Sequence, residues 1–195
     1  MNTPNKLTVA RIIATPVFMV TMLLNFPYHY TVSLVIFVLA SITDAIDGKM
    51  ARKYNLVTSF GKFLDPLADK MLTTAAFLGF ISMYAGTKYC WQLTAITFIV
   101  LFREFAVSSV RLVVVSSGGK VIAANIWGKL KTVTQMVGIV FALFAYVLIA
   151  DFGISSIADT CNIIICAVFW LSAVLCIISG FIYLFGSKEY IDPSK

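Results

Sequence analysis

The stretch SITDAIDGKMARKYNLVTSFGKFLDPLADK, residues 41–70, places four aspartates inside 26 residues of a largely apolar chain. They are Asp44, Asp47, Asp65 and Asp69, whereas the whole sequence contains only nine acidic residues. The first two are spaced i, i+3 and the last two i, i+4, so each pair lies on one face if its segment is helical. The residues between the pairs form a connection short enough to join two antiparallel helices. The two pairs can then face each other.

The composition of the chain indicates a membrane protein. Of the 195 residues, 60% are hydrophobic and only 12% are charged, and the mean hydropathy is +0.93. Soluble domains usually carry about 25% charged residues. A soluble domain of this size could not bury so much apolar surface, so we expect one all-α membrane domain that covers residues 1–195.

Six apolar stretches are candidates to cross a bilayer, which takes about 20 mostly apolar residues. They cover residues 9–26, 31–50, 61–84, 91–115, 131–150 and 162–185. Lysine and arginine are frequent in the N-terminal segment and in alternate connections, and rare or absent in the connections between them. By the positive-inside rule, this alternation places both termini and the aspartates in the cytoplasm. We therefore predict a polytopic protein with about six transmembrane helices.

The net charge of +6 does not indicate nucleic-acid binding, because the sequence has no long basic run and no basic patch interleaved with aromatic residues. Topology and contact with anionic lipid head groups account for most of the charge. The four cysteines lack the spacing of a metal site, and we interpret them as small apolar residues.

The facing carboxylates need positive compensation, since they repel one another and are costly to desolvate. A hard divalent cation suits them, because Mg²⁺ takes oxygen ligands and commonly bridges carboxylates to substrate phosphates. Mn²⁺ accepts the same donors. Gly48 and Gly61 remove bulk beside the carboxylates, so helices or a phosphorylated ligand can approach closely. Thr58 and Ser59 are candidate N-caps for the helix that carries the second pair.

A lone acidic residue at a membrane boundary is often only a solvated helix end, but here eight specified residues are spread over 26 positions. They resemble the signature of the CDP-alcohol phosphatidyltransferase family, with every fixed position present. The matching pattern is Asp44-x2-Asp47-Gly48-x2-Ala51-Arg52-x8-Gly61-x3-Asp65-x3-Asp69. Members of that family have six spans, and they transfer a phosphatidyl or related group from a CDP-linked donor to an alcohol with release of CMP.

The resemblance implies roles for the matching residues, and it suggests a homodimer. The residues that would hold the metal, two ions of Mg²⁺ or Mn²⁺, are Asp44, Asp47, Asp65 and Asp69. The residues that would border the cytidine diphosphate are Asp44, Gly48, Arg52 and Gly61. Asp69 would also be the general base that takes the proton of the acceptor hydroxyl.

Three further stretches resemble segments of the bacterial phosphatidylglycerophosphate synthases within this family, and so bear on the acceptor. They are NTPNKLTVAR (2–11), FREFAVSSVRLV (102–113) and ANIWGKLKTVTQM (124–136). As a group, the cations of these stretches favour an anionic acceptor, although any one of them could equally contact lipid head groups. The residues expected to bind the acceptor phosphate are Thr8, Arg11, Arg103, Arg111, Lys129 and Lys131.

Glu104 directly follows Arg103, and neighbouring residues of a helix point in different directions. We therefore do not expect these two side chains to form an ion pair with each other. We expect another cation to be the partner of Glu104.

The leading hypothesis is transfer of phosphatidyl from CDP-diacylglycerol to glycerol 3-phosphate in a bacterial plasma membrane, with the site facing the cytoplasm. The products would be phosphatidylglycerol phosphate and CMP. Inositol phosphate, inositol or serine are alternative acceptors. A membrane prenyltransferase usually has two aspartate-rich motifs farther apart than here. An ion or proton transporter would place its carboxylates near the bilayer midplane rather than at one edge.

Overall fold

The computed structural model describes residues 2–53, 58–116 and 126–187, and these residues form helices and short connections without a strand. The long helices are α1 (Thr3–Leu23), α2 (His29–Lys53), α3 (Ser59–Met83), α4 (Cys90–Ser116), α5 (Ile126–Tyr146) and α6 (Ala158–Gly186). A π-helical segment, η1 (Val147–Asp151), continues α5, and a short 3₁₀ turn, η2 (Ser155–Ile157), precedes α6. The expected all-α class is confirmed.

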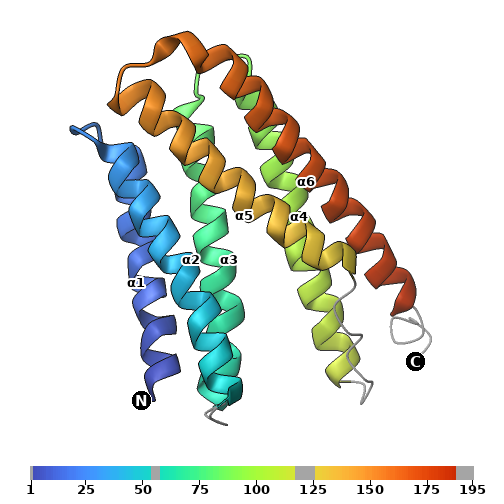
Figure 1. The fold of residues 1–195 in the computed structure, drawn as a ribbon. Coiled ribbons are helices and arrows are strands. Elements are labelled where there is room, and N and C mark those ends of the chain that lie inside the picture. Colours follow the sequence, from blue (N-terminus) through green and yellow to red (C-terminus); the bar gives the residue numbers. More distant parts are fainter. Residues whose placement is uncertain (1, 54–57, 117–125, 188–195) are drawn as a thin grey trace.

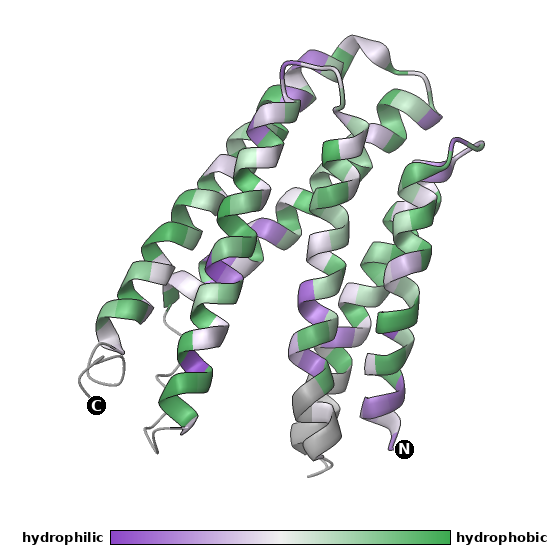
Figure 2. Cartoon of the chain, turned by 180° about the vertical axis from the view of Figure 1, so that it is seen from behind, coloured by the Kyte–Doolittle hydropathy of each residue, from purple (hydrophilic) through white to green (hydrophobic). Residues whose placement is uncertain are grey.

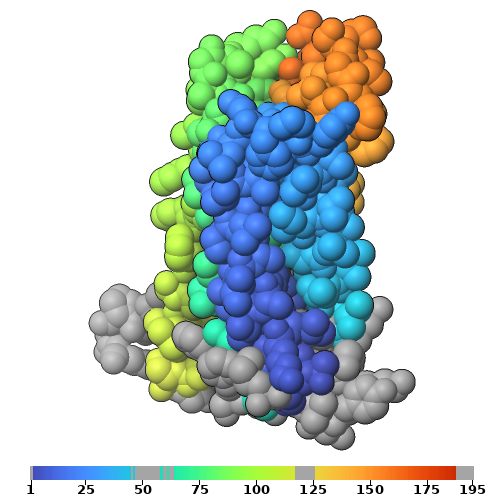
Figure 3. Space-filling model, turned by 90° about the vertical axis from the view of Figure 1, so that its left-hand side faces the viewer, coloured from blue at the N-terminus to red at the C-terminus, as the bar shows by residue number. Residues whose placement is uncertain are grey.

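The helices form two groups that meet side by side (Figure 1). Helix α1 packs against both α2 and α3, and α6 packs against both α4 and α5. Contacts of α2 with α5 and of α3 with α4 join the two groups. Figure 3 shows α1 and α2 lying alongside each other on one face. The start of α1 and the end of α6 lie at the same end of the bundle (Figure 1).

The helices are largely apolar along their length, as the colours of Figure 2 show, and many large hydrophobic side chains are exposed. Within the described residues, three helical stretches are long and apolar enough to cross a membrane. They are Thr3–Leu23, Ile126–Asp151 and Ser155–Gly186, and His29–Asp44 is a shorter apolar stretch. The structure therefore has the membrane-compatible helices that the composition predicts. The expected number of about six spans and the orientation of the termini stay predictions.

Helices α5 and α6 approach closely at Gly138. A Cβ atom at this position would lie 2.8 Å from Cε1 of Phe169 and 3.0 Å from Cγ1 of Val168. The ring of Phe169 also packs on Phe77 and Phe80 of α3, with ring centroids 5.1 and 5.6 Å away. Gly138 therefore lets one buried phenylalanine hold three helices together.

Gly138→Leu is expected to lower the midpoint of thermal unfolding in detergent, because overpacking a dense interior costs about 1–3 kcal/mol. The matched control is Val137→Leu, at a neighbouring position that is 59% exposed. Equal midpoints for the two variants would contradict the close packing of α5 on α6.

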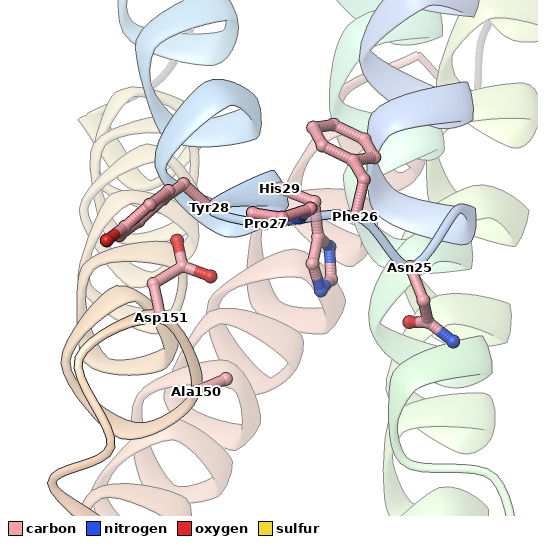
Figure 4. A pocket seen from close by; sticks show the side chains of 7 residues that line it. All are labelled: Asn25, Phe26, Pro27, Tyr28, His29, Ala150 and Asp151. Atoms are coloured by element: carbon pink, nitrogen blue, oxygen red, sulfur yellow. The ribbon is translucent and has the colours of Figure 1, made fainter.

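A polar contact fastens the end of the bundle that lies away from the start of α1. Oδ2 of Asp151, at the end of η1, accepts hydrogen bonds of 2.7 Å from both the backbone N–H and the hydroxyl of Thr31 at the start of α2. A cavity of about 570 Å³ lies beside this contact, lined by residues 25–29 with Ala150 and Asp151 (Figure 4). None of the predicted site residues lines it.

Candidate functional site

A second cavity, of about 910 Å³, brings the predicted carboxylates and cations together. One wall is acidic, with Asp44 from α2 and Asp65 and Asp69 from α3. The facing wall carries four charged residues from α4 and α5. They are Arg103, Glu104, Arg111 and Lys131. Residues far apart in the sequence thus line one chamber in which the two groups of helices meet.

The start of α3 fixes the direction in which Asp65 and Asp69 project. Thr58 has extended backbone angles and its hydroxyl accepts a 3.0 Å hydrogen bond from the N–H of Gly61, so the predicted N-cap is confirmed. The side-chain amide of Asn5 in α1 donates a 2.9 Å hydrogen bond to the same hydroxyl. The cap therefore also ties α3 to α1.

Gly61 stands where α1 approaches the start of α3. A Cβ atom here would lie 2.9 Å from Oδ1 of Asn5 and 3.3 Å from Oγ1 of Thr58. In the structure, the group that approaches Gly61 closely is the side chain of Asn5. Its role beside the cytidine diphosphate stays a prediction.

Two residues of α1 hold the carboxylates of the acidic wall. Arg11 is 2% exposed, and its guanidinium forms an ion pair with Oδ1 of Asp44, whose side chain is 41% exposed. The hydroxyl of Thr8, also buried, donates a 2.8 Å hydrogen bond to Oδ1 of Asp65. We expected Thr8 and Arg11 to reach the acceptor phosphate. The structure places both against carboxylates of the acidic wall, and their contact with the acceptor phosphate stays a prediction.

Asp69 is partly buried at the centre of this arrangement. The negative charges of Asp44 and Glu104 and the positive charges of Lys131 and Arg11 all act on its carboxylate. Asp69 also lines a neighbouring apolar groove of about 670 Å³, whose walls come from α1, α3, α4 and α5. Its carboxylate therefore lies where a polar chamber meets an apolar one.

The basic wall is organised around Glu104. Lys131 of α5, which is 6% exposed, forms an ion pair with Oε1 of Glu104. Nη1 of Arg103 lies 3.2 Å from the same oxygen, and Nζ of Lys70 lies 3.8 Å from Oε2. The expected cationic partner of Glu104 is thus present. The expectation that Arg103 and Glu104 do not pair is wrong, because the long guanidinium side chain bends back to its neighbour.

Packing between α4 and α6 confines the side chain of Arg103. A Cβ atom at Gly180 of α6 would lie 3.2 Å from Cγ of Arg103. The Nε atom of Arg103 is buried and has no hydrogen-bond partner among the described residues. Gly180 leaves room for the methylene groups of Arg103, and Arg103 lines the cavity.

Of the other predicted site residues, one lines the cavity, one does not, and three have surroundings that the structure does not describe. Arg111 lines the cavity, whereas Lys129 is exposed and is not part of the described lining. Asp47, Gly48 and Arg52 belong to α2, but only their place in the helix is described. Their predicted roles therefore stay predictions.

The residues of the acidic wall have the donor chemistry that a hard divalent cation requires, since each offers carboxylate oxygens. Within the part of the chain that is described, no group of three acidic, histidine or cysteine side chains is already close enough to hold a metal ion. The side chain of Asp47, the fourth predicted ligand, is outside that part. Metal binding by these aspartates stays a prediction that fits their chemistry.

Comparison with known proteins decides the family. The sequence profile described as CDP-alcohol phosphatidyltransferase matches residues 1–178. The chain belongs to this family. The resemblance carried by the aspartate pattern is thereby confirmed.

Relatives in the family are similar to this chain over nearly its full length. A Bacillus subtilis (strain 168) protein named CDP-diacylglycerol--glycerol-3-phosphate 3-phosphatidyltransferase is 36% identical over 206 residues, covering 100% of this chain and 99% of its own. A Rickettsia bellii protein of the same name is 40% identical over 193 residues, covering 97% of each chain. A Salmonella typhimurium protein of that name is 38% identical over 144 residues, covering 73% of this chain and 77% of its own.

Sequence reasoning did not predict several residues that line the cavity, and Lys70 and Tyr183 are two of them. Lys70 directly follows Asp69, and its ammonium group donates to the hydroxyl of Ser108 on α4. Tyr183 of α6 also lines the cavity, and its buried hydroxyl has no hydrogen-bond partner among the described residues. The signal for Lys70 was a cation inside an apolar stretch, which is costly without a function or a partner. Nothing in the sequence distinguished Tyr183 from other aromatic residues.

Proposed function

We propose that this chain transfers the phosphatidyl group of CDP-diacylglycerol to the primary hydroxyl of glycerol 3-phosphate, giving phosphatidylglycerol phosphate and CMP. The observation that carries the proposal is the single cavity of about 910 Å³ with an acidic wall facing a basic wall. A diphosphate that arrives with divalent metal suits the first wall, and a dianionic phosphate suits the second. The names of the full-length relatives support the same donor and acceptor.

In the proposed reaction, the acceptor hydroxyl oxygen attacks the phosphorus that carries diacylglycerol, and the bond from that phosphorus to CMP breaks. Asp69 takes the proton of the hydroxyl, which requires its carboxylate to be ionised and close to the acceptor. Bound Mg²⁺ or Mn²⁺, expected as two ions, would neutralise charge on the diphosphate and stabilise the CMP leaving group. The residues proposed to hold the metal are Asp44, Asp47, Asp65 and Asp69.

The two substrates would enter from different sides. The nucleotide and glycerol 3-phosphate would use the polar cavity, with Gly48, Arg52 and Gly61 beside the cytidine diphosphate. The adjoining apolar groove, which shares Asp69 and Lys70 with that cavity, has the chemistry that acyl chains require. Glu104 and Lys131 are shared as well, so the charged groups lie where the cavity and the groove join.

The proposed setting is a bacterial plasma membrane crossed by six helices, with both termini and the polar cavity on the cytoplasmic side. Two observations support it. The start of α1 and the end of α6 lie at the same end of the bundle (Figure 1). Lysine and arginine alternate between frequent and rare along the connections, as the positive-inside rule requires. A homodimer is proposed from the family resemblance alone.

The test is CMP release by the purified protein in detergent, with CDP-diacylglycerol and Mg²⁺, in the presence and absence of glycerol 3-phosphate. We expect release only when the acceptor is present. Inositol phosphate, inositol and serine are assayed in parallel. Release with one of these in place of glycerol 3-phosphate would keep the family chemistry and overturn the acceptor. No release with any alcohol, from folded protein, would overturn the proposed reaction.

A further inference from the structure

The basic wall contains a carboxylate where a proposed anionic substrate binds, which is unexpected for an anion site. Glu104 contacts Lys131, Arg103 and Lys70, which come from α5, α4 and α3. Its side chain is 19% exposed, so these contacts are only partly screened by solvent. Glu104 repels an incoming phosphate, so its interaction with the surrounding cations must favour phosphate binding by more than this repulsion opposes it.

The charge balance of this cluster matches a phosphomonoester. Three cations around one carboxylate leave two positive charges in excess. A phosphomonoester carries a charge of about −1.5 to −2 near pH 7. The cluster also has spare donors, because each lysine has three N–H groups, the arginine has five, and one carboxylate cannot accept them all. Glu104 can therefore hold the cations while they still donate to a second anion.

Without Glu104, Lys131 would lose its strongest partner while remaining buried. A buried cation without a partner either loses its proton or moves to another carboxylate. Asp69 is an alternative partner, since it lines the same cavity as Lys131 and directly precedes Lys70 in sequence. Either change removes positive charge from the basic wall.

We propose that Glu104 is a positioning residue for the acceptor: through Lys131 above all, it keeps the cations of α3, α4 and α5 directed at the phosphate of glycerol 3-phosphate and away from Asp69. The proposal rests on the proposed function, and it assigns to Glu104 and Lys70 roles that the aspartate signature does not contain. We expect its main consequence on acceptor binding, because the cations that Glu104 contacts are the ones proposed to bind the acceptor phosphate.

The test measures KM for both substrates in Glu104→Gln, which keeps the shape of the side chain and removes its charge. We expect KM for glycerol 3-phosphate to rise by about 10- to 100-fold, the range for losing hydrogen bonds to charged groups. KM for CDP-diacylglycerol should change by no more than about threefold, because a selective KM change reports lost ground-state binding of one substrate. Glu104→Asp, which restores the charge on a shorter side chain, should recover part of the acceptor affinity.

A double variant guards against misfolding of Glu104→Gln. Glu104→Gln combined with Lys131→Met removes the carboxylate together with the most buried of its three cationic partners, so the double variant should fold. If Glu104 acts through Lys131, the double variant should have the same KM for glycerol 3-phosphate as Lys131→Met alone. A KM that rises multiplicatively in the double variant would overturn the proposal.

Two other results would also overturn it: an unchanged KM for glycerol 3-phosphate in folded Glu104→Gln, or equal increases of KM for both substrates. The charge control is Asp159→Asn, at an exposed position in the first turn of α6, which should leave both KM values unchanged. The wild-type protein assayed with glycerol 3-phosphate separates this inference from the proposed function. If the wild type does not use that acceptor, the function fails before any variant is compared.

Discussion

Asp69→Asn is expected to reduce CMP release by about 10²–10⁴-fold, the usual contribution of a positioned general base. The amide preserves the size of the side chain but cannot take the proton of the acceptor hydroxyl. Asp69 is the predicted metal ligand that lines both the polar cavity and the apolar groove, where a lipid-linked phosphate and a small alcohol would meet. Initial rates of CMP release at saturating CDP-diacylglycerol and glycerol 3-phosphate measure the effect.

The design must separate a lost base from a lost metal ligand, because both roles are proposed for Asp69. Activity of Asp69→Asn is therefore measured over a range of Mg²⁺ concentrations. A missing base is not replaced by more metal, whereas a weakened metal site is refilled at high concentration. Recovery of wild-type rates at high Mg²⁺ would contradict the base assignment. Asp159→Asn, exposed on α6, serves as the matched aspartate control.

Removal of divalent metal is expected to abolish CMP release, and addition of Mg²⁺ or Mn²⁺ should restore it. The acidic wall places Asp44, Asp65 and Asp69 around one cavity, and a diphosphate donor would add further negative charge to it. Without metal, the repulsion between the carboxylates and the donor is uncompensated. The measurement is the rate after treatment with EDTA and after titration with each metal. Full activity in EDTA would contradict a metal-dependent reaction.

Thr8→Val provides a graded test of the same site. The valine keeps the shape of the side chain and removes the hydroxyl that donates to Oδ1 of Asp65. Loss of a hydrogen bond that orients a metal ligand typically lowers metal affinity by about 10–100-fold. We therefore expect the Mg²⁺ concentration for half-maximal activity to rise, with the maximal rate largely retained. An unchanged Mg²⁺ dependence would mean that Thr8 does not orient a metal ligand.

Local sequence pattern was sufficient for the helical class and for the faces of the helices. Asp65 and Asp69 are one turn apart, so a helix at this position must present them on the same side. Thr58 is a good N-cap because its hydroxyl reaches the N–H of Gly61 within the same short segment. The apolar composition likewise predicts helices, since a bilayer leaves every backbone N–H and C=O to be satisfied within the segment.

Contacts between distant residues could not be read from those patterns. The packing of α1 against α2 and α3 places Arg11 on Asp44 and Thr8 on Asp65, contacts that no spacing along the chain predicted. Spacing along a helix states which side chains share a face. It does not state which other helix that face will meet.

The pairing of Arg103 with Glu104 shows the same limit at close range. Their adjacent positions predict divergent directions, yet both reach the same point, because α6 confines the arginine stem at Gly180 and α5 brings Lys131 to the carboxylate. The sequence by itself thus determined the family and the helical class, and it predicts which residues carry the chemistry, because all three depend on local spacing. Only the tertiary structure decided which distant charges meet, because the ion pairs Arg11–Asp44, Lys70–Glu104 and Lys131–Glu104 each depend on how two separate helices pack.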